Sequence, residues 1–198
     1  MSTLTTPVLG FANPVLDSQR TFRQVLTAMS RPGVPIAVTP KLEPPAPLTV
    51  VSAAIALTLF DLDTPVWLDP VVSTSEAKAY LGFHCGCPVI DARKDAAFAV
   101  LADPAGLADL AEFSTGTPEF PDRSTTLIVQ VRAFGRGKHL VFRGPGIDGA
   151  AEIQVDGLPT AFSDIWANNH AFFPEGVDLI LGSPDAIVGL PRSIRVEG

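Results

Sequence analysis

Seven short turn-like motifs in a fixed order constrain the fold of this chain more than any other feature of its sequence. Proline fixes φ and glycine permits positive φ, so a chain that carries such residues in pairs is held at defined corners. Corners of this kind keep loops in particular shapes, as a surface or site built from loops on a rigid scaffold requires. The motifs are residues 28–33 (AMSRPG), 57–68 (LTLFD and then TPVWL), 83–84 (FH), 114–117 (STGT), 144–147 (GPGI), 173–179 (FPEGVDL) and 190–192 (LPR). No complete catalytic set lies within them.

The composition indicates a large core beneath a surface with few charges. Hydrophobic residues make up 46% of the 198 residues, and the mean hydropathy is +0.30. Charged residues make up only 18%, against about a quarter in an average domain, which indicates that part of the surface is buried against a partner. The alternative is that alanine, valine and leucine simply enrich the helices.

The charge balance excludes two classes of partner. Lys and Arg number 14 against 21 Asp and Glu, so the net charge is −7 and the pI is near 4.8. An acidic chain without a densely basic window does not bind nucleic acid or an anionic membrane non-specifically. The longest apolar run, residues 50–60, is too short to span a bilayer, and no signal-peptide pattern or disulfide framework is recognisable. We therefore expect a cytoplasmic globular protein.

The first half of the chain predicts alternating helices and strands after a loose arm at residues 1–12. A helix is expected to begin at Pro14, with Asn13 as its N-cap. Its buried face is predicted to hold Val15, Phe22, Val25, Leu26 and Met29. A central helix, apolar on most sides, is predicted over residues 49–62. Further elements are a helix from Ser73 or Thr74 to about Leu81, strands at 34–38, 66–68 and 97–101, a strand or loop at 84–90, and a helix at 104–113.

The second half is richer in strands. It is expected to hold a hairpin of residues 125–134 and 139–143, strands at 151–155 and 177–181, a helix at 162–171, and a last strand at 187–196 broken by Pro191. Neither an internal repeat nor a domain boundary is apparent. The predicted fold is therefore α/β, a single domain over residues 13–198 in the form of a layered sandwich with a mixed sheet.

Residues 144–149 (GPGIDG) match the dinucleotide-binding pattern G-x-G-x-x-G and follow a predicted strand. A pyrophosphate would need a long helix directly behind this loop, and residues 150–158 do not predict one. Pro145 also removes one backbone donor from the loop. We therefore expect a structural turn here and no cofactor bound by this chain.

Two other groups of side chains could carry chemistry. His84, Cys85 and Cys87 form the tightest metal-capable cluster, but zinc sites usually take two separated ligand pairs, and neighbours on a strand face opposite sides. Buried thiols beside a hydrogen-bonded histidine are favoured over metal or cysteine chemistry, so no metal is expected. Asp61 and Asp63 end a helix whose dipole disfavours anions. A turn hydrogen bond is the favoured compensation, ahead of solvent, magnesium or a basic partner.

Three arginines adjoin turn motifs: Arg31, Arg143 and Arg192. A guanidinium binds phosphate or carboxylate bidentately, so these arginines indicate a phosphate-bearing ligand or an ionic interface. Local pairing with the abundant Asp and Glu explains them equally well. None of the lysines lies in an apolar, pocket-like context, which argues against a Schiff-base mechanism.

The ordered combination of motifs resembles the PhnH family of the bacterial carbon–phosphorus lyase system, from about Phe11 to Val196. No single motif is specific, whereas their order and spacing are. The resemblance rests first on residues 28–33, 114–117 and 144–147, and is reinforced by residues 173–179 and 190–192.

The resemblance implies a fold like the large domain of pyridoxal-phosphate-dependent transferases, without the cofactor. It implies a homodimer in isolation and, in the cell, a core complex with the PhnG, PhnI and PhnJ proteins. With ATP as substrate, PhnG, PhnH, PhnI and PhnL would replace adenine with a phosphonate and form a ribose 1-phosphonate 5-triphosphate. PhnJ would later cleave that product after removal of pyrophosphate. PhnI is expected to carry the glycosyl chemistry, so a PhnH protein would be required without being catalytic alone.

Three interpretations stay open from the sequence. The chain is an obligatory subunit of that complex, or a freestanding dimeric enzyme or binding protein for a phosphate-bearing small molecule, or a structural adaptor. In the second case Arg31 and Arg192 would grip an anion and His84 would move protons. No catalytic residue of the family maps securely onto this chain. The candidate site residues are therefore Arg31, Asp61, His84, Arg143 and Arg192, and the role of Cys85 and Cys87 is left open.

Overall fold

A computed structural model describes residues 9–198 and places two β-sheets and four α-helices. The α-helices are α1 (Pro14–Ser30), α2 (Val50–Leu59), α3 (Ser75–His84) and α4 (Phe162–His170). The strands are β1 (Ile36–Ala37), β2 (Val66–Leu68), β3 (Val89–Ile90), β4 (Phe98–Leu101), β5 (Thr126–Gln130), β6 (Ala133–Arg143), β7 (Ala151–Asp156), β8 (Asp178–Gly182), β9 (Ala186–Leu190) and β10 (Arg195–Glu197). None of these helices is long and apolar enough to cross a membrane.

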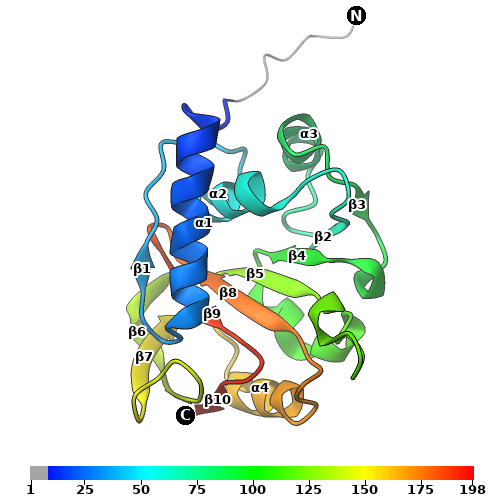
Figure 1. Ribbon diagram of the computed structural model, residues 1–198. Helices are drawn as coiled ribbons and strands as arrows, with labels where there is room; N and C mark the ends of the chain where they lie inside the picture. Colours follow the sequence, from blue (N-terminus) through cyan, green and yellow to red (C-terminus); the bar gives the residue numbers. More distant parts are fainter. Residues whose placement is uncertain (1–8) are drawn as a thin grey trace, which may run out of the picture.

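The larger sheet has seven strands in the order β1-β9-β8-β5-β4-β2-β3 (Figure 1). Strands β3, β2, β4, β5 and β8 run parallel, whereas β9 is antiparallel to both β8 and β1. The smaller sheet has the antiparallel order β10-β6-β7. The α/β class with a mixed sheet is thus confirmed.

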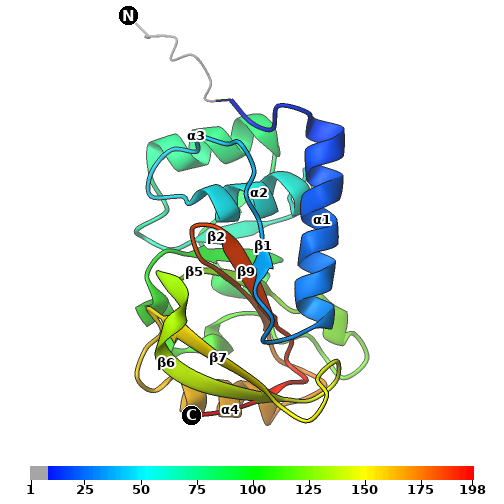
Figure 2. The same cartoon turned by 90° about the vertical axis from the view of Figure 1, so that its left-hand side faces the viewer.

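Two cores lie on opposite faces of the larger sheet, because its central strands are buried on both sides. On β5, Leu127 and Val129 face one core while Ile128 faces the other, as the period of two requires. The first core contains side chains of β6, β7 and α4, and the second contains side chains of α1, α2 and α3. Figure 2 shows α2 and α3 at one end of the molecule and the smaller sheet with α4 at the other.

Local capping signals mark the helix starts. The Asn13 side chain accepts a hydrogen bond from the Leu16 backbone N–H and begins α1, as predicted. Thr74 caps α3 through the Ala77 N–H. Of the loose arm predicted at residues 1–12, residues 1–8 lie outside the described residues. In the described part, Phe11 packs against the second core, which contains side chains of α1, α2 and α3.

The predicted buried face of α1 is partly wrong: Val25 is buried and Met29 packs against the core, as predicted, but the rest of the face differs. The buried residues are Thr21, Val25 and Ala28, whereas Val15, Phe22 and Leu26 are exposed. The reason is a close approach of α1 to β9. A Cβ placed at Gly189 would lie 2.5 Å from the Ala28 carbonyl oxygen, so only small side chains fit between the helix and the strand. At this close approach the helix therefore turns the small Ala28 inward, while Phe22 and Leu26 face outward.

The expected hairpin of residues 125–143 is also wrong, because its two halves enter different sheets. Strand β5 is a central parallel strand of the larger sheet, while β6 pairs with β7 and β10. The expected last strand likewise divides at Pro191 into β9 and β10, one in each sheet. Residues 104–113 form short 3-10 helices (Pro104–Ala108 and Leu110–Glu112), and His84 ends α3 instead of starting a strand.

Candidate functional site

Several turn motifs meet where α1 ends. A Cβ placed at Gly146 would lie 2.4 Å from the Ser30 carbonyl oxygen, and φ there is +82°. Gly144 lies similarly close to the segment before β10, with 3.1 Å from its Cβ position to the Ser193 carbonyl oxygen. Both contacts favour glycine, since a side chain would press on backbone atoms. The motifs at 28–33, 144–147 and 190–192 are therefore parts of one packed corner.

Arg192 ties this corner to the start of β8. Its Nε donates to Asp178 Oδ1 at 3.1 Å, its Nη2 donates to Asp178 Oδ2, and its backbone N–H donates to Asp178 Oδ1 at 2.7 Å. The remaining guanidinium donors reach the Pro121 carbonyl oxygen and the Ser124 hydroxyl. Only 13% of the side chain is exposed. Arg192 thus joins three segments, and its donors are used within the fold.

Arg31 and Arg143 lie at the same end of the molecule and are exposed. Arg31 is the C-cap of α1, and its backbone N–H donates to the Thr27 carbonyl. Arg143 ends β6, where its Nε lies 3.6 Å from Glu197 Oε1 and its Nη1 donates to the Gly149 carbonyl at 3.3 Å. Both residues are open to solvent, in contrast to Arg192.

Asp61 and His84 lie near the other end, after α2 and at the end of α3. Asp61 Oδ1 accepts hydrogen bonds from the Asp63 N–H at 3.0 Å and the Thr64 hydroxyl at 2.6 Å, which is the turn that the sequence favours. The half-buried His84 ring lies edge-on to Tyr80, with 4.6 Å between ring centroids. The five candidate residues therefore do not gather into one site. Their chemical roles stay predictions.

Cys85 and Cys87 form a thiol pair beneath α2. The Cys85 Sγ also approaches the Ala56 carbonyl oxygen at 3.6 Å. The hydrogen bond between the two thiols, together with burial, raises the pKa of Cys85, and the same bond lowers the pKa of Cys87. Across residues 9–198, His, Cys, Asp and Glu side chains form no group of three that could hold a metal ion.

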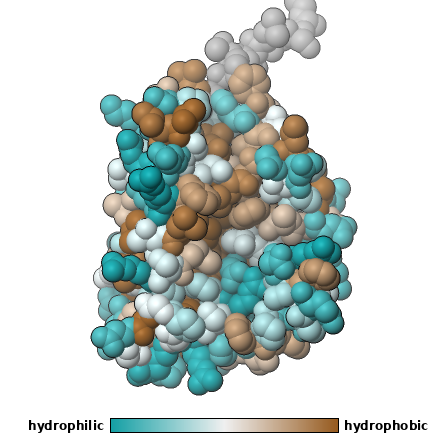
Figure 3. Space-filling view, viewed as in Figure 1, coloured by the Kyte–Doolittle hydropathy of each residue, from teal (hydrophilic) through white to brown (hydrophobic). Residues whose placement is uncertain are grey.

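The exposed side of α1 carries an apolar stripe of Val15, Phe22 and Leu26. These side chains are 76%, 45% and 53% exposed, and their spacing places them along one side of the helix. Phe83 at the end of α3 is 67% exposed. In Figure 3, apolar residues gather at the centre of the face that α1, α2 and α3 form. We call this surface, with Val15, Phe22, Leu26 and Phe83, the helix face.

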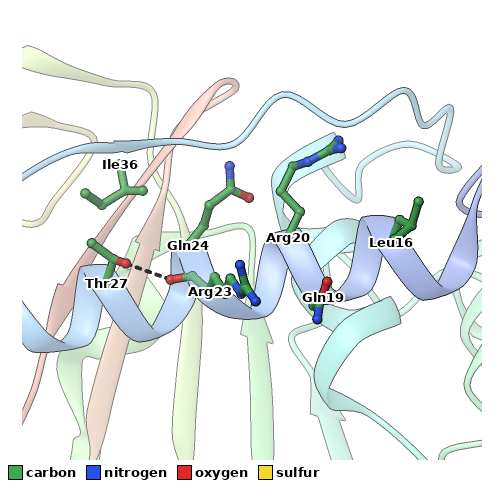
Figure 4. A pocket seen from close by; sticks show the side chains of 7 residues that line it. All are labelled: Leu16, Gln19, Arg20, Arg23, Gln24, Thr27 and Ile36. Atoms are coloured by element: carbon green, nitrogen blue, oxygen red, sulfur yellow. Dashed lines mark hydrogen bonds between the residues drawn. The ribbon is translucent and has the colours of Figure 1, made fainter.

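Two hollows flank the apolar stripe. One, of about 490 Å³, is lined by Gly10, Phe11, Pro14, Val15, Ser18, Leu57 and His84. The other, of about 340 Å³, is lined by Leu16, Gln19, Arg20, Arg23, Gln24, Thr27 and Ile36. Figure 4 shows Leu16, Arg20 and Gln24 extending from one side of α1. Arg20 pairs with Asp17 at 3.5 Å and Gln24 donates to the Ala37 carbonyl at 2.7 Å. An apolar centre with a polar rim that contains arginine is typical of a protein–protein interface.

One buried carboxylate was missed at the sequence level. Asp69 follows β2 directly and is 2% exposed. Its oxygens accept three backbone hydrogen bonds, from Val72 at 2.7 Å, Ala102 at 2.7 Å and Asp103 at 2.9 Å. An acidic residue directly after an apolar strand was the available signal. One bond lies within the loop after β2 and two reach residues 33 and 34 positions away, so Asp69 links the loops after β2 and β4.

Comparison with known proteins assigns the family. The family model described as bacterial phosphonate metabolism protein (PhnH) matches residues 9–197. The chain belongs to this family. The match covers every element described above, from α1 to β10, so the resemblance seen in the turn motifs is confirmed.

Two individual proteins are similar to this chain over most of their length. The alpha-D-ribose 1-methylphosphonate 5-triphosphate synthase subunit PhnH of Rhizobium meliloti (strain 1021) is 44% identical over 188 residues, which cover 95% of this chain and 94% of the relative. The putative C-P lyase subunit protein HtxG of Stutzerimonas stutzeri is 34% identical over 183 residues, 90% of this chain and 85% of the relative.

Proposed function

We propose that this chain is a subunit of the carbon–phosphorus lyase core complex and acts in the use of phosphonates. The complex would form a ribose 1-phosphonate 5-triphosphate from ATP and a phosphonate, with release of adenine. The observation that carries this proposal is the 44% identity, over 95% of the chain, to a protein named as a subunit of the corresponding synthase. ATP would be a substrate of the complex, and this chain would bind no cofactor of its own.

A subunit needs a docking surface, and the helix face supplies one. Full burial of a Phe or Leu side chain contributes about 1.5–3 kcal/mol relative to leaving it in water, so an apolar stripe left exposed forgoes that stabilisation. Phe22 and Leu26 lie side by side on α1, at i and i+4, and Val15 extends the stripe by two turns. The low share of charged residues, 18%, supports the same conclusion.

The partners in this proposal are the PhnG, PhnI and PhnJ proteins, with PhnL acting in the reaction. In isolation, two copies of this chain would form a homodimer and cover the helix face. Cytoplasmic assembly is part of the proposal, since ATP is the substrate. The chain would not be catalytic alone, because its candidate residues lie at two separate ends of the molecule.

Co-expression tests both parts of the proposal. The chain is produced with PhnG, PhnI and PhnJ of the same organism, and the complex is purified through a tag on PhnI. We expect stoichiometric recovery of the wild type. The recovered amount of Phe22→Asp or Leu26→Asp should fall by at least about tenfold, because a few buried residues carry most of the binding energy of an interface and a carboxylate in their place opposes burial. Phe172→Asp is the matched control, since Phe172 is 63% exposed but lies beyond α4, away from the helix face.

Two results would contradict the proposal in different ways. If PhnG, PhnI and PhnJ assemble without the wild-type chain, the chain is not a subunit. If Phe22→Asp is recovered as well as Phe172→Asp, the chain docks through another surface. For the isolated chain, sedimentation analysis should show a dimer for the wild type and a monomer for Phe22→Asp.

A further inference from the structure

A third hollow, of about 390 Å³, lies at the end of the molecule opposite α3. It forms where the end of β6, the last turn of α4 and the segment leading into β10 meet. Figures 1 and 2 both place α4 and β10 at the end away from α3. Arg143, His170, Phe173 and Arg195 are among its lining residues, and no Asp or Glu of the described residues lines it. We propose that this hollow binds the oxyanion of a small phosphate ester or phosphonate.

The first argument is a pair of like charges. Arg195 of β10 and Arg143 of β6 are direct partners across the antiparallel strands. Their neighbours Val196 and Phe142 are buried, so both arginines point to the exposed side of the sheet. Directly opposed residues have Cβ atoms about 4.5–5.5 Å apart, and like charges at that spacing repel. An anion held between the two guanidinium groups removes this repulsion.

The protein itself offsets only part of this charge. Glu197 lies 3.6 Å from Arg143, and both side chains are at least half exposed, so the pair is weak. Arg195 has no carboxylate partner among the described residues. In a chain with a net charge of −7, two adjacent arginines with one peripheral carboxylate form a local positive site.

His170 fixes how Arg195 is held. The His170 Nδ1 lies 2.9 Å from the Arg192 carbonyl oxygen, which can only accept, so Nδ1 carries the proton. Nε2 then accepts from the Arg195 Nε–H at 3.3 Å. The neutral ring positions the Arg195 guanidinium without cancelling its charge. A positioned guanidinium fork is the group that binds phosphate bidentately.

Phe173 adds an apolar wall beside the charges. Its ring is stacked on His170, with 6.4 Å between centroids and 30° between planes, and 56% of the residue is exposed. Such a wall suits a small organic group attached to the anion, such as the methyl group of an alkylphosphonate. The choice of a phosphonate as ligand rests on the proposed function, whereas the anion site itself rests on the two arginines and does not depend on the helix face.

Titration of the full chain with anions tests the site. Inorganic phosphate and methylphosphonate are titrated calorimetrically at constant ionic strength set with chloride. We expect dissociation constants on the order of 1 mM or below, and a loss of at least about tenfold in Arg143→Gln and in Arg195→Gln. Arg136→Gln is the control, because Arg136 is an exposed arginine of the same strand, 68% exposed and paired with Asp156. It should leave the affinity within about twofold of the wild type.

Three outcomes would overturn the proposal. They are no binding by the wild type, unchanged binding by Arg195→Gln, or an equal loss in Arg136→Gln. Unchanged thermal unfolding of the ligand-free variants would establish that they fold, and each anion should raise the melting temperature of the wild type but not that of Arg143→Gln or Arg195→Gln. Phe173→Ala separates the two ligands. It should weaken methylphosphonate and leave phosphate unchanged, and a failure to do so contradicts the role of the apolar wall. Arg195→Gln should still assemble with PhnG, PhnI and PhnJ.

Discussion

Arg192 and Asp178 face each other across 14 residues of sequence and pair through both carboxylate oxygens. Each side chain is largely shielded, with 13% and 17% exposure. Asp178 also accepts the backbone N–H of Arg192, so one carboxylate satisfies both the main chain and the side chain of its partner. This contact joins the start of β8 to the turn that separates the two sheets.

Removing the carboxylate should be costly. Asp178→Ala leaves a mostly buried guanidinium without its counter-charge, and we expect a loss on the order of 3 kcal/mol in the free energy of unfolding. Urea denaturation measures it. Glu152→Ala, which removes a 71% exposed carboxylate beside His139, should cost less than about 1 kcal/mol. Equal losses in the two variants would show that the Arg192 contact carries no special stability.

Gly189 on β9 should tolerate no side chain. Its Cβ position lies 2.5 Å from the Ala28 carbonyl oxygen and 2.6 Å from the Ala28 carbonyl carbon, both backbone atoms of α1. Gly189→Ala would therefore force α1 from the sheet, and we expect a loss on the order of 3 kcal/mol or failure to fold. Gly82→Ala is the opposite case, because nothing lies within 4 Å of its Cβ position in α3. That change should raise stability by about 1 kcal/mol. Thermal denaturation of both variants decides the point.

Tyr80 is the one tyrosine of the chain, and its buried hydroxyl has no hydrogen-bond partner within residues 9–198. Burial, and then the charge of Cys85, raise the pKa of Tyr80 to about 12 from 10.0. The folded state thus keeps the phenol proton at a pH where the unfolded state loses it. This contribution to stability is fully present below pH 10.0 and is lost as the pH rises toward about 12.

Tyr80→Phe tests this account in two ways. Removing an unpaired buried hydroxyl should raise the free energy of unfolding by about 1 kcal/mol at neutral pH. It should also remove the alkaline loss of stability that the tyrosine causes. In the wild type, the near-ultraviolet absorbance of tyrosinate reports the titration directly, since no second tyrosine contributes. A midpoint near 10 in the folded protein would contradict the burial argument.

Asp69 should matter for stability more than its lack of ionic partners within residues 9–198 suggests. Asp69 is 2% exposed, and Asp69→Ala leaves three backbone N–H groups without their acceptor. Each unpaired group costs about 1–3 kcal/mol, and water that reaches the group reduces this cost. Asp69→Asn keeps an acceptor oxygen and should cost less. Hydrogen exchange at Val72, Ala102 and Asp103 measures the effect locally. Unchanged protection in Asp69→Ala would contradict it.

Local signals in the sequence predicted the helix starts and the fold class. Asn13 and Thr74 cap their helices through side-chain oxygens within three residues, and such short-range contacts depend little on the rest of the fold. The α/β class follows from the alternation of elements. The likeness to pyridoxal-phosphate-dependent transferases stays a prediction.

Tertiary contacts account for the errors. The close approach of α1 to the sheet occurs at Gly189, a residue far along the chain, so the helical pattern alone predicted Val25 correctly but Phe22 and Leu26 wrongly. Strands β5 and β6 follow each other closely, which suggested a hairpin. A continuous apolar run in β5, against the polar and glycine-rich β6, was the signal for a central parallel strand beside a half-exposed one.

The candidate site was harder to predict than the fold. Arg143 was singled out, whereas Arg195 and His170 were not, because strand register brings Arg195 beside Arg143 and an α4 residue completes the hollow. The pairing of Arg192 with Asp178 was equally hidden, although both residues lie in recognised motifs. Single residues could be chosen from sequence, but the contacts among them depend on the two sheets.

Both edge strands of the larger sheet, β1 and β3, are two residues long. On β1, the Ala37 carbonyl already accepts from Gln24. The edges of this sheet therefore offer a partner chain almost no free backbone groups to pair with, and assembly by adding a strand to this sheet is disfavoured. Recognition along this sheet must instead depend on side chains, which diverge faster than backbone geometry. A relative at 44% identity would then be matched to the partner proteins of its own organism.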